Sequence, residues 1–253
     1  MYHELHVPGR ALAVADPGYG LYCVARDAFR EHMDALAEAG LRGAALGEAR
    51  ARGDARTVAI TFDDGCGSDW TEAAPILRER GFGATFFVIA GFLGRRGYMT
   101  AAQVRELAAA GFEVGSHSLT HRMLTELSPA EVEDELAGSR LRLEELAGAP
   151  VVHLSCPHGR WSRAVVAAAQ RAGYETVSTS RVGLNGPSTP ATRLRRIAVL
   201  RGTGGGELPR LARGEGLWRR IARDAALDAG KRLLGEAGYA ALRGRMLRLR
   251  GGG

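Results

Sequence analysis

The feature that most constrains the fold is a regular alternation between short β-branched or aromatic runs and helical patterns. The runs expected to form strands cover residues 58–62, 84–89, 112–115, 151–155, 175–179 and 196–200, with a stub at Tyr2-His3. The patterns expected to form helices cover residues 26–39, 72–80, 101–110, 129–146 and 163–172. This alternation is typical of βαβ units around a parallel sheet. About seven strands favour a closed or nearly closed barrel, whose functional groups lie at the carboxyl ends of the strands.

Three of the expected strands are followed directly by polar residues that do not belong in a hydrophobic core. These residues are Asp63-Asp64 after 58–62, His117 and His121 after 112–115, and Cys156-Pro157-His158-Gly159 after 151–155. Because the carboxyl ends of parallel strands meet at one edge of a sheet, we expect the three groups to lie close together.

Two adjacent carboxylates raise each other's pKa, so a nearby cation stabilises their ionised forms. His117 and His121 are four residues apart, a spacing that places two imidazoles on one face of a helical turn. One carboxylate and two imidazoles leave positions open for water, as in catalytic rather than structural metal sites. Asp63 and Asp64 point in opposite directions on an extended segment, so one would bind the ion and the other would act as general base. The spacing alone does not assign the two roles.

These residues also resemble a known family. Three segments look like the first three motifs of the polysaccharide deacetylases, the group with NodB homology also called carbohydrate esterase family 4: Thr61-Phe62-Asp63-Asp64-Gly65, Ser116-His117-Ser118-Leu119-Thr120-His121 and Pro157-His158-Gly159. The similarity extends from Tyr2-His3 to about Leu200. It implies an α/β fold, the distorted (β/α)7 barrel of this family, which agrees with the strand pattern.

The resemblance also implies roles for individual residues. Asp63 would be the catalytic base, and Asp64, His117 and His121 would bind a divalent metal ion, for which zinc is the preferred candidate. The backbone amide of His158 would help to form an oxyanion site.

The chain departs from the family pattern at two places. Many members have an arginine in the third motif that orients the base, but Ser155 occupies that position here. No histidine follows His158, so the late histidine that supplies the general acid has no counterpart. Circularly permuted relatives carry an equivalent histidine near the N-terminus, and His3 is therefore the candidate acid.

The segment after the third strand end is the expected substrate-binding region, comprising Pro157, His158, Gly159 and Trp161. As a side chain, His158 fits a metal ligand, an acid or a plain loop residue. Trp161 fits either stacking on a sugar ring or core packing.

The net charge of +6 is concentrated near the C-terminus. We expect a catalytic domain at residues 1–201 and a basic helical C-terminal extension at residues 202–253. The extension has apolar residues at helical spacing with arginines between them, which fits either peripheral contact of residues 217–250 with an anionic membrane or packing on the barrel. The charge does not by itself indicate nucleic-acid binding.

The N-terminus lacks the pattern of a secretion signal, and the three cysteines show neither disulfide-framework nor zinc-site spacing. We therefore expect a cytoplasmic protein, with peripheral contact at the inner membrane surface as a further expectation.

The expected function is the removal of N-acetyl groups from an amino sugar in a polysaccharide, an oligosaccharide or a lipid-linked glycan intermediate. The alternatives are hydrolysis of a cyclic amide of purine breakdown, hydrolysis of an O-acyl group, and a catalytically weak module that binds glycans.

Overall fold

The computed structural model describes residues 1–222 and 225, and its centre is a parallel sheet of five strands in the order β5-β6-β7-β8-β9. The strands are β5 (Thr61–Phe62), β6 (Thr85–Val88), β7 (Glu113–Ser116), β8 (His153–Ser155) and β9 (Thr176–Ser178). Two parallel pairs stand beside it: β1 (Leu5–His6) with β2 (Val24–Ala25), and β3 (Arg42–Ala44) with β4 (Thr57–Ala59). The fold class is thus confirmed as α/β, with the parallel strands forming a curled half-barrel.

Single bridges extend the five-stranded sheet at both edges. Tyr2 pairs with Phe62 on one side, and Leu194 pairs with Ser178 on the other, both in parallel orientation. Seven positions around the half-barrel are therefore filled, although the two outermost are single bridges. The expected strand at 196–200 is wrong, because Val199 donates its amide hydrogen to the carbonyl of Met1 instead of entering the sheet.

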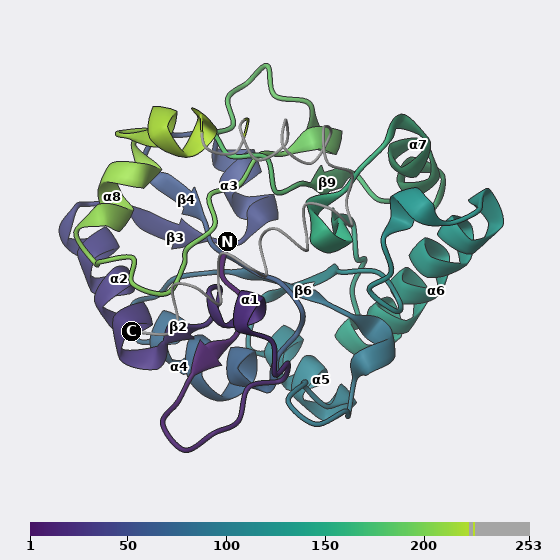
Figure 1. Ribbon diagram of the computed structural model, residues 1–253, viewed down its shortest axis with the longest axis horizontal. Helices are drawn as coiled ribbons and strands as arrows, with labels where there is room; N and C mark the ends of the chain where they lie inside the picture. The colour runs from purple at the N-terminus through teal and green to yellow at the C-terminus, as the bar shows by residue number, and fades with distance from the viewer. Residues whose placement is uncertain (223–224, 226–253) are drawn as a thin grey trace. The chain divides into compact units, whose positions relative to one another are not determined.

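Helices lie before, between and after the strands of the sheet (Figure 1). They are α1 (Pro17–Gly20), α2 (Arg26–Glu38), α3 (Leu46–Arg52), α4 (Ala74–Arg78), α5 (Ala101–Ala109), α6 (Pro129–Ala147), α7 (Arg163–Arg171) and α8 (Glu207–Ala212), with a π-helical turn η1 (Asp69–Ala73) before α4. Helices α5 and α6 contact β7. The long helix α6 begins where its sequence predicts, because Ser128 and Glu131 form a reciprocal capping box.

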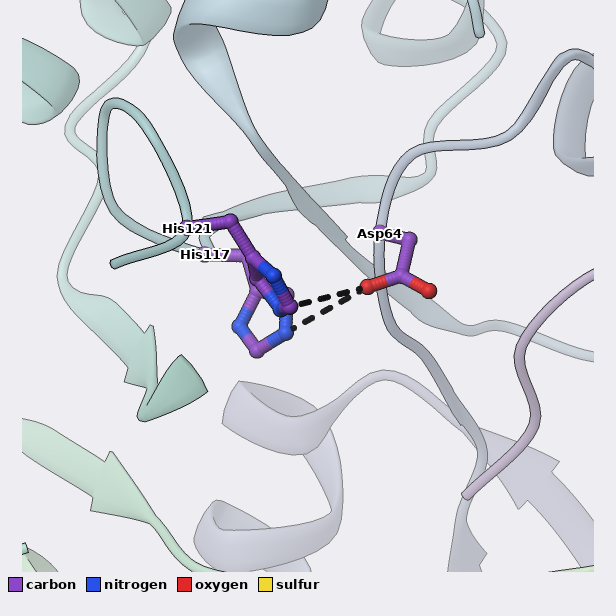
Figure 2. Close-up of side chains that lie close together, drawn as sticks. All are labelled: Asp64, His117 and His121. Carbon is purple, nitrogen blue, oxygen red and sulfur yellow. Dashed lines mark ion pairs between the residues drawn. The ribbon is translucent and has the colours of Figure 1, made fainter. Parts of the chain in front are cut away.

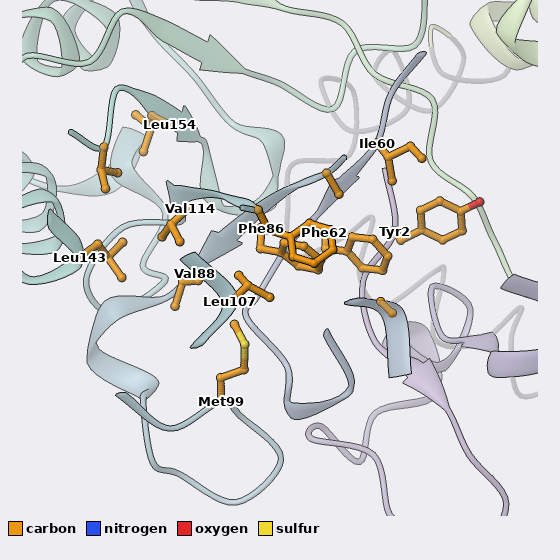
Figure 3. Packing of buried hydrophobic residues seen from close by; sticks show 14 of the residues in the cluster. Tyr2, Ile60, Phe62, Phe86, Val88, Met99, Leu107, Val114, Leu143 and Leu154 are labelled. Atoms are coloured by element: carbon orange, nitrogen blue, oxygen red, sulfur yellow. The ribbon is translucent and has the colours of Figure 1, made fainter. Parts of the chain in front are cut away.

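The core fills the space between the sheet and these helices. Phe62 of β5 stacks on Phe86 of β6 with ring centroids 4.9 Å apart, and Tyr2 stacks on the other side of Phe62 at 5.3 Å (Figure 3). All four residues of β6 are buried, as expected for a central parallel strand. This packing fixes the positions of β5 and its neighbours, and so of the residues that follow their carboxyl ends.

The chain divides into two compact units, Met1–Glu215 and Gly216–Gly253. The predicted domain boundary after residue 201 stays a prediction. The basic helical extension predicted for 202–253 lies largely outside the described residues. None of the helices in the described part of the chain is long and apolar enough to span a membrane.

Candidate metal centre and catalytic site

Side chains from two strand ends converge at the carboxyl edge of the sheet. Asp64 follows β5, and His117 and His121 follow β7 (Figure 2). The Oδ1 atom of Asp64 lies 3.5 Å from Nε2 of His117 and 3.6 Å from Nε2 of His121. The structure therefore brings together the three side chains predicted to be metal ligands, whose donor atoms all lie within 4.8 Å of one another.

The Asp64 side chain is directed by its backbone. Asp64 adopts a left-handed conformation with φ of 81°, and Gly65 follows with φ of 72°. A side chain on Gly65 would also meet Val88 of β6 at 3.0–3.3 Å, so only glycine suits this turn. The prediction of an extended Asp63-Asp64 segment is thus wrong at Asp64. The two carboxylates still separate, because the chain turns sharply between them.

The predicted helical turn that carries the two histidines is also wrong. Residues 117–121 form an irregular loop in which Ser118 and His121 both adopt positive φ values, 64° and 62°. The buried carboxylate of Glu135, on α6, accepts hydrogen bonds from the amides of Leu119 and Thr120 at 2.9 and 2.8 Å. Because this carboxylate satisfies the backbone groups that a helix would pair internally, the loop is stable and presents both imidazoles to one point.

The two separations between Asp64 and the imidazoles fit a tetrahedral ion. Ligands held at about 2.0–2.2 Å from zinc lie roughly 3.3–3.6 Å from one another in that arrangement. Nδ1 of His117 donates to the carbonyl oxygen of Ser155 at 2.8 Å, which leaves the lone pair of Nε2 facing Asp64. Burial lowers the pKa of His117, and lowers that of His121 to about 2, so both rings are neutral at pH 7 and able to bind a cation.

Asp64 lacks a positively charged protein partner at short distance in the described part of the chain. Burial, together with the charge of Asp63, raises the pKa of Asp64 to about 7. The Tyr19 hydroxyl donates a hydrogen bond to Asp64 that partly opposes this rise, and it also lies 3.3 Å from Sγ of Cys66. A cation in contact with Asp64 would offset the cost of burying its charge.

Asp63, unlike Asp64, has a positively charged partner in direct contact. Its two carboxylate oxygens accept hydrogen bonds from Nη1 and Nη2 of Arg196 at 2.7 and 2.8 Å. Ser155 Oγ donates a third at 3.2 Å. Burial acts to raise the pKa of Asp63, but the charge of Arg196 outweighs it and holds the pKa well below its usual range. Asp63 is therefore an ionised carboxylate beside the candidate metal ligands.

His3, the predicted acid, is close enough to this group for its charge to matter. Burial lowers the pKa of His3 to about 4, while the nearby charge of Asp63 raises it and that of Arg196 lowers it. Its Nδ1 atom is buried and has no hydrogen-bond partner in the described residues. His3 is thus a neutral imidazole with a nitrogen available next to the site.

The predicted substrate segment forms a tight turn, η4 (Pro157–Gly159), after β8. His158 is exposed and has φ of 56°, and its ring centroid lies 4.7 Å from that of His121. A Cβ atom on Gly159 would meet Ser180 Oγ at 2.1 Å, so the turn excludes any side chain there. The turn thus lies against the candidate metal ligands.

Trp161 follows that turn and is half-buried. The guanidinium carbons of Arg193 and Arg181 lie 5.4 and 6.0 Å from its ring centroid. Both arginines are exposed, and neither pairs with a carboxylate in the described part of the chain.

Sequence reasoning missed Arg196, Glu135 and Tyr19. The only signal for Arg196 was a charged residue at the start of an expected buried run. Glu135 has the appearance of an ordinary exposed residue of an amphipathic helix, and nothing in the sequence around Tyr19 indicates a contact with Asp64.

Comparison with known proteins places this site in a family. Residues 50–177 match the family model described as Polysaccharide deacetylase. The chitooligosaccharide deacetylase of Bradyrhizobium sp. (strain ANU 289) is 35% identical over 127 residues, which are 49% of this chain and 56% of the relative. The peptidoglycan-N-acetylglucosamine deacetylase of Bacillus cereus is 30% identical over 123 residues, 48% of this chain and 55% of the relative. The chain thus spans just over half the length of these curated relatives.

A solved structure supports the same fold. The deacetylase PplD of Streptococcus pyogenes, in complex with acetate, superposes with a TM-score of 0.72 at 24% identity. The match covers 82% of this chain and 93% of that one. At this identity the likeness establishes the fold alone.

Proposed function

Because the chain belongs to the polysaccharide deacetylase family, we propose that it is a metal-dependent hydrolase that removes N-acetyl groups from an amino sugar of a glycan. One observation carries the proposal: an ionised carboxylate, Asp63, lies beside a three-donor group, Asp64, His117 and His121. A base and a metal site side by side are the two elements that amide hydrolysis by an activated water needs.

Asp64, His117 and His121 would hold a divalent ion, and zinc is the ion we propose. One carboxylate and two imidazoles suit zinc, and the 3.5 and 3.6 Å separations fit its tetrahedral geometry. When bound, the ion supplies a Lewis acid for the amide carbonyl and lowers the pKa of water.

The protein groups around the ion would divide the remaining work. Asp63 accepts the proton of the attacking water, and the His158 amide donates a hydrogen bond to the developing oxyanion. His3, which is neutral at pH 7, would relay to the departing amine the proton that Asp63 takes from the water, so that acetate and a free amino sugar are formed. The turn at Pro157–Gly159 positions the His158 amide, and Trp161, which follows this turn, would border the sugar.

We further propose that the glycan carries a phosphate-linked group, as lipid-linked and nucleotide-linked sugars do. Residues 150–201 contain eight arginines and one acidic residue, Glu175. Arg181 and Arg193 lie beside Trp161 without a carboxylate partner in the described residues. Arginine binds phosphate oxygens with high geometric specificity.

A cytoplasmic location is the corresponding proposal, and it is consistent with three buried, free cysteines. We also propose that residues 217–250 contact the inner membrane surface. Nearly all of these residues are outside the part of the chain that the structure describes. Cell fractionation with and without that segment tests both points.

The decisive experiment measures metal content and acetate release together. Zinc-loaded protein would be offered N-acetylglucosamine oligomers, a nucleotide-linked N-acetylglucosamine and a polyprenyl-diphosphate-linked one. We expect acetate from at least one substrate, and fastest release from the diphosphate-bearing ones. Asp63→Asn should keep the metal and lose activity about 100-fold or more, and His3→Ala should also slow release.

Each negative result has a defined meaning. Equal rates on neutral and diphosphate-bearing glycans would refute the phosphate proposal alone. If metal-loaded wild type released no acetate from any substrate, the proposed activity would be wrong, and assays with cyclic amides of purine breakdown, O-acylated sugars and glycan binding would follow.

A further inference from the structure

The third motif of this chain has a serine, Ser155, where many family members have an arginine that orients the base. The Asp63 carboxylate nevertheless contacts a guanidinium group, because Arg196 reaches it from a different segment. Asp63 and Arg196 are 133 residues apart in the sequence. The arginine is therefore not missing from the site, but comes from another part of the chain.

Several hydrogen bonds hold the Arg196 guanidinium in place against Asp63. Arg196 is 8% exposed, and its guanidinium makes four hydrogen bonds with its five N–H donors. Nη1 and Nη2 bind the two oxygens of Asp63, Nη2 also binds Ser155 Oγ at 2.8 Å, and Nε donates to the carbonyl of Thr179 at 3.0 Å. The guanidinium carbon of Arg196 lies over the Phe87 ring, 5.7 Å from its centroid.

The backbone explains how Arg196 arrives there. Leu194 extends the sheet beyond β9 through its bridge to Ser178, and the amide of Arg196 donates to the carbonyl of Arg181 at 2.9 Å. The segment that carries Arg196 is thus anchored at the edge of the sheet, two positions beyond β8. From this edge the long side chain contacts Thr179 after β9, Ser155 at the end of β8 and Asp63 after β5.

Ser155 and Arg196 act as a matched pair. The short Ser155 side chain leaves room for the incoming guanidinium, accepts a hydrogen bond from it and donates one to Asp63. An arginine at position 155 would compete with Arg196 for the same space and the same carboxylate. The serine is accordingly the residue that makes an arginine from another segment possible.

We propose that Arg196, together with Ser155, is the positioning element for the catalytic base Asp63, and replaces the arginine that many relatives carry in the third motif. This inference rests on the proposed function, because it assumes that Asp63 accepts a proton. A two-pronged contact fixes the plane of the carboxylate as well as its charge, which a lysine cannot do. It also neutralises Asp63 independently of any ion bound by Asp64.

The competing explanation is that Arg196 merely holds its own segment to the sheet. The key variant is Arg196→Ala, for which we expect kcat to fall about 100-fold with KM changed less than about threefold and with metal content unchanged. Guanidinium ion at millimolar concentration should restore at least a tenth of the lost activity, because it can occupy the vacated space. A structural role alone predicts no such rescue.

Moving the arginine back provides the strongest test. The double variant Ser155→Arg with Arg196→Ala should recover activity to within about tenfold of wild type, whereas Ser155→Ala with Arg196→Ala should not. Arg195→Ala is the matched control, since Arg195 is the exposed neighbour on the same segment and should change kcat less than twofold. Arg196→Lys keeps the charge without the fork and should still lose at least tenfold in kcat.

Three results would overturn the inference. Arg196→Ala with kcat within threefold of wild type would do so, as would a loss that neither guanidinium nor the relocated arginine repairs. If Arg196→Ala fails to fold, the Arg196→Lys variant decides: a stable Arg196→Lys protein with the kcat of the wild type would overturn the inference.

A double-mutant cycle of thermal unfolding, with changes at Asp63 and Arg196, separates this inference from the proposed function, because it needs no substrate. Arg196→Ala with Asp63→Asn should be no less stable than Arg196→Ala alone if the two side chains interact directly. A cycle without coupling would refute the contact. If the wild type proved inactive while the cycle showed coupling, the contact would stand. The proposed function, and with it the role of Arg196 in catalysis, would be refuted.

Discussion

Two neighbouring regions of the site each contain a buried carboxylate, and they differ in the groups that surround its charge. The base region, Asp63 with Ser155 and Arg196, compensates a buried carboxylate with a protein cation. The metal region, Asp64 with His117 and His121, surrounds a buried carboxylate with neutral imidazoles. The pKa of Asp63 is consequently held below its usual range, while that of Asp64 is raised to about 7. Adjacent residues of the same type thus acquire different chemistry from their surroundings. The charge of Asp63 is compensated within the protein, whereas that of Asp64 would be compensated by a bound cation.

Removing the carboxylate of the metal region should have the largest effect on activity. Asp64→Asn removes the one charged side chain among the three proposed ligands, so we expect loss of the ion and a decrease in acetate release of at least about 10⁴-fold. Metal analysis and the acetate assay check this. Retention of stoichiometric metal by Asp64→Asn would show that the ion binds elsewhere.

Removing the carboxylate of the base region should instead destabilise the fold. Asp63→Ala leaves the buried guanidinium of Arg196 without its counter-ion, which costs roughly 3–5 kcal/mol of unfolding free energy. Urea denaturation of the metal-free protein measures the change. The double change with Arg196→Ala should cost less than the sum of the single changes, and strict additivity would contradict direct pairing.

The two regions should also respond differently to pH. A raised pKa means that Asp64 binds a proton below about pH 7, so a metal ion must displace that proton. Apparent zinc affinity should therefore fall as pH drops below 7, by about tenfold per pH unit for one competing proton. Asp63, whose pKa is lowered, should stay ionised over the same range. A zinc titration from pH 5.5 to 8 checks this, and a flat profile would argue against a raised pKa.

The smallest effect is expected from Ser155→Ala. This change removes one hydrogen bond to Asp63 at 3.2 Å but leaves both contacts from Arg196. The loss of about 1 kcal/mol corresponds to roughly a fivefold decrease in kcat. A decrease greater than about 100-fold would mean that Ser155, rather than Arg196, orients the base.

The regular elements were largely predictable, because their signals are local. Helix α6 follows its capping box at Ser128, and β6 follows its apolar run. The expected strand at 58–62 is instead divided at Ile60, whose amide bonds to Ala44 while its carbonyl bonds to Thr85. The extended run changes sheets there, and no local propensity reveals such an exchange of partners.

The sequence by itself determined the family and the chemical types of the candidate metal ligands, because a pair of carboxylates and two histidines at strand ends form a short, local pattern. The tertiary structure alone decided which groups compensate them. Asp64 and His121 reach their positions through left-handed backbone conformations, and Arg196 reaches Asp63 from 133 residues away. These contacts depend on how the sheet brings distant segments together, and a one-dimensional pattern does not contain that information.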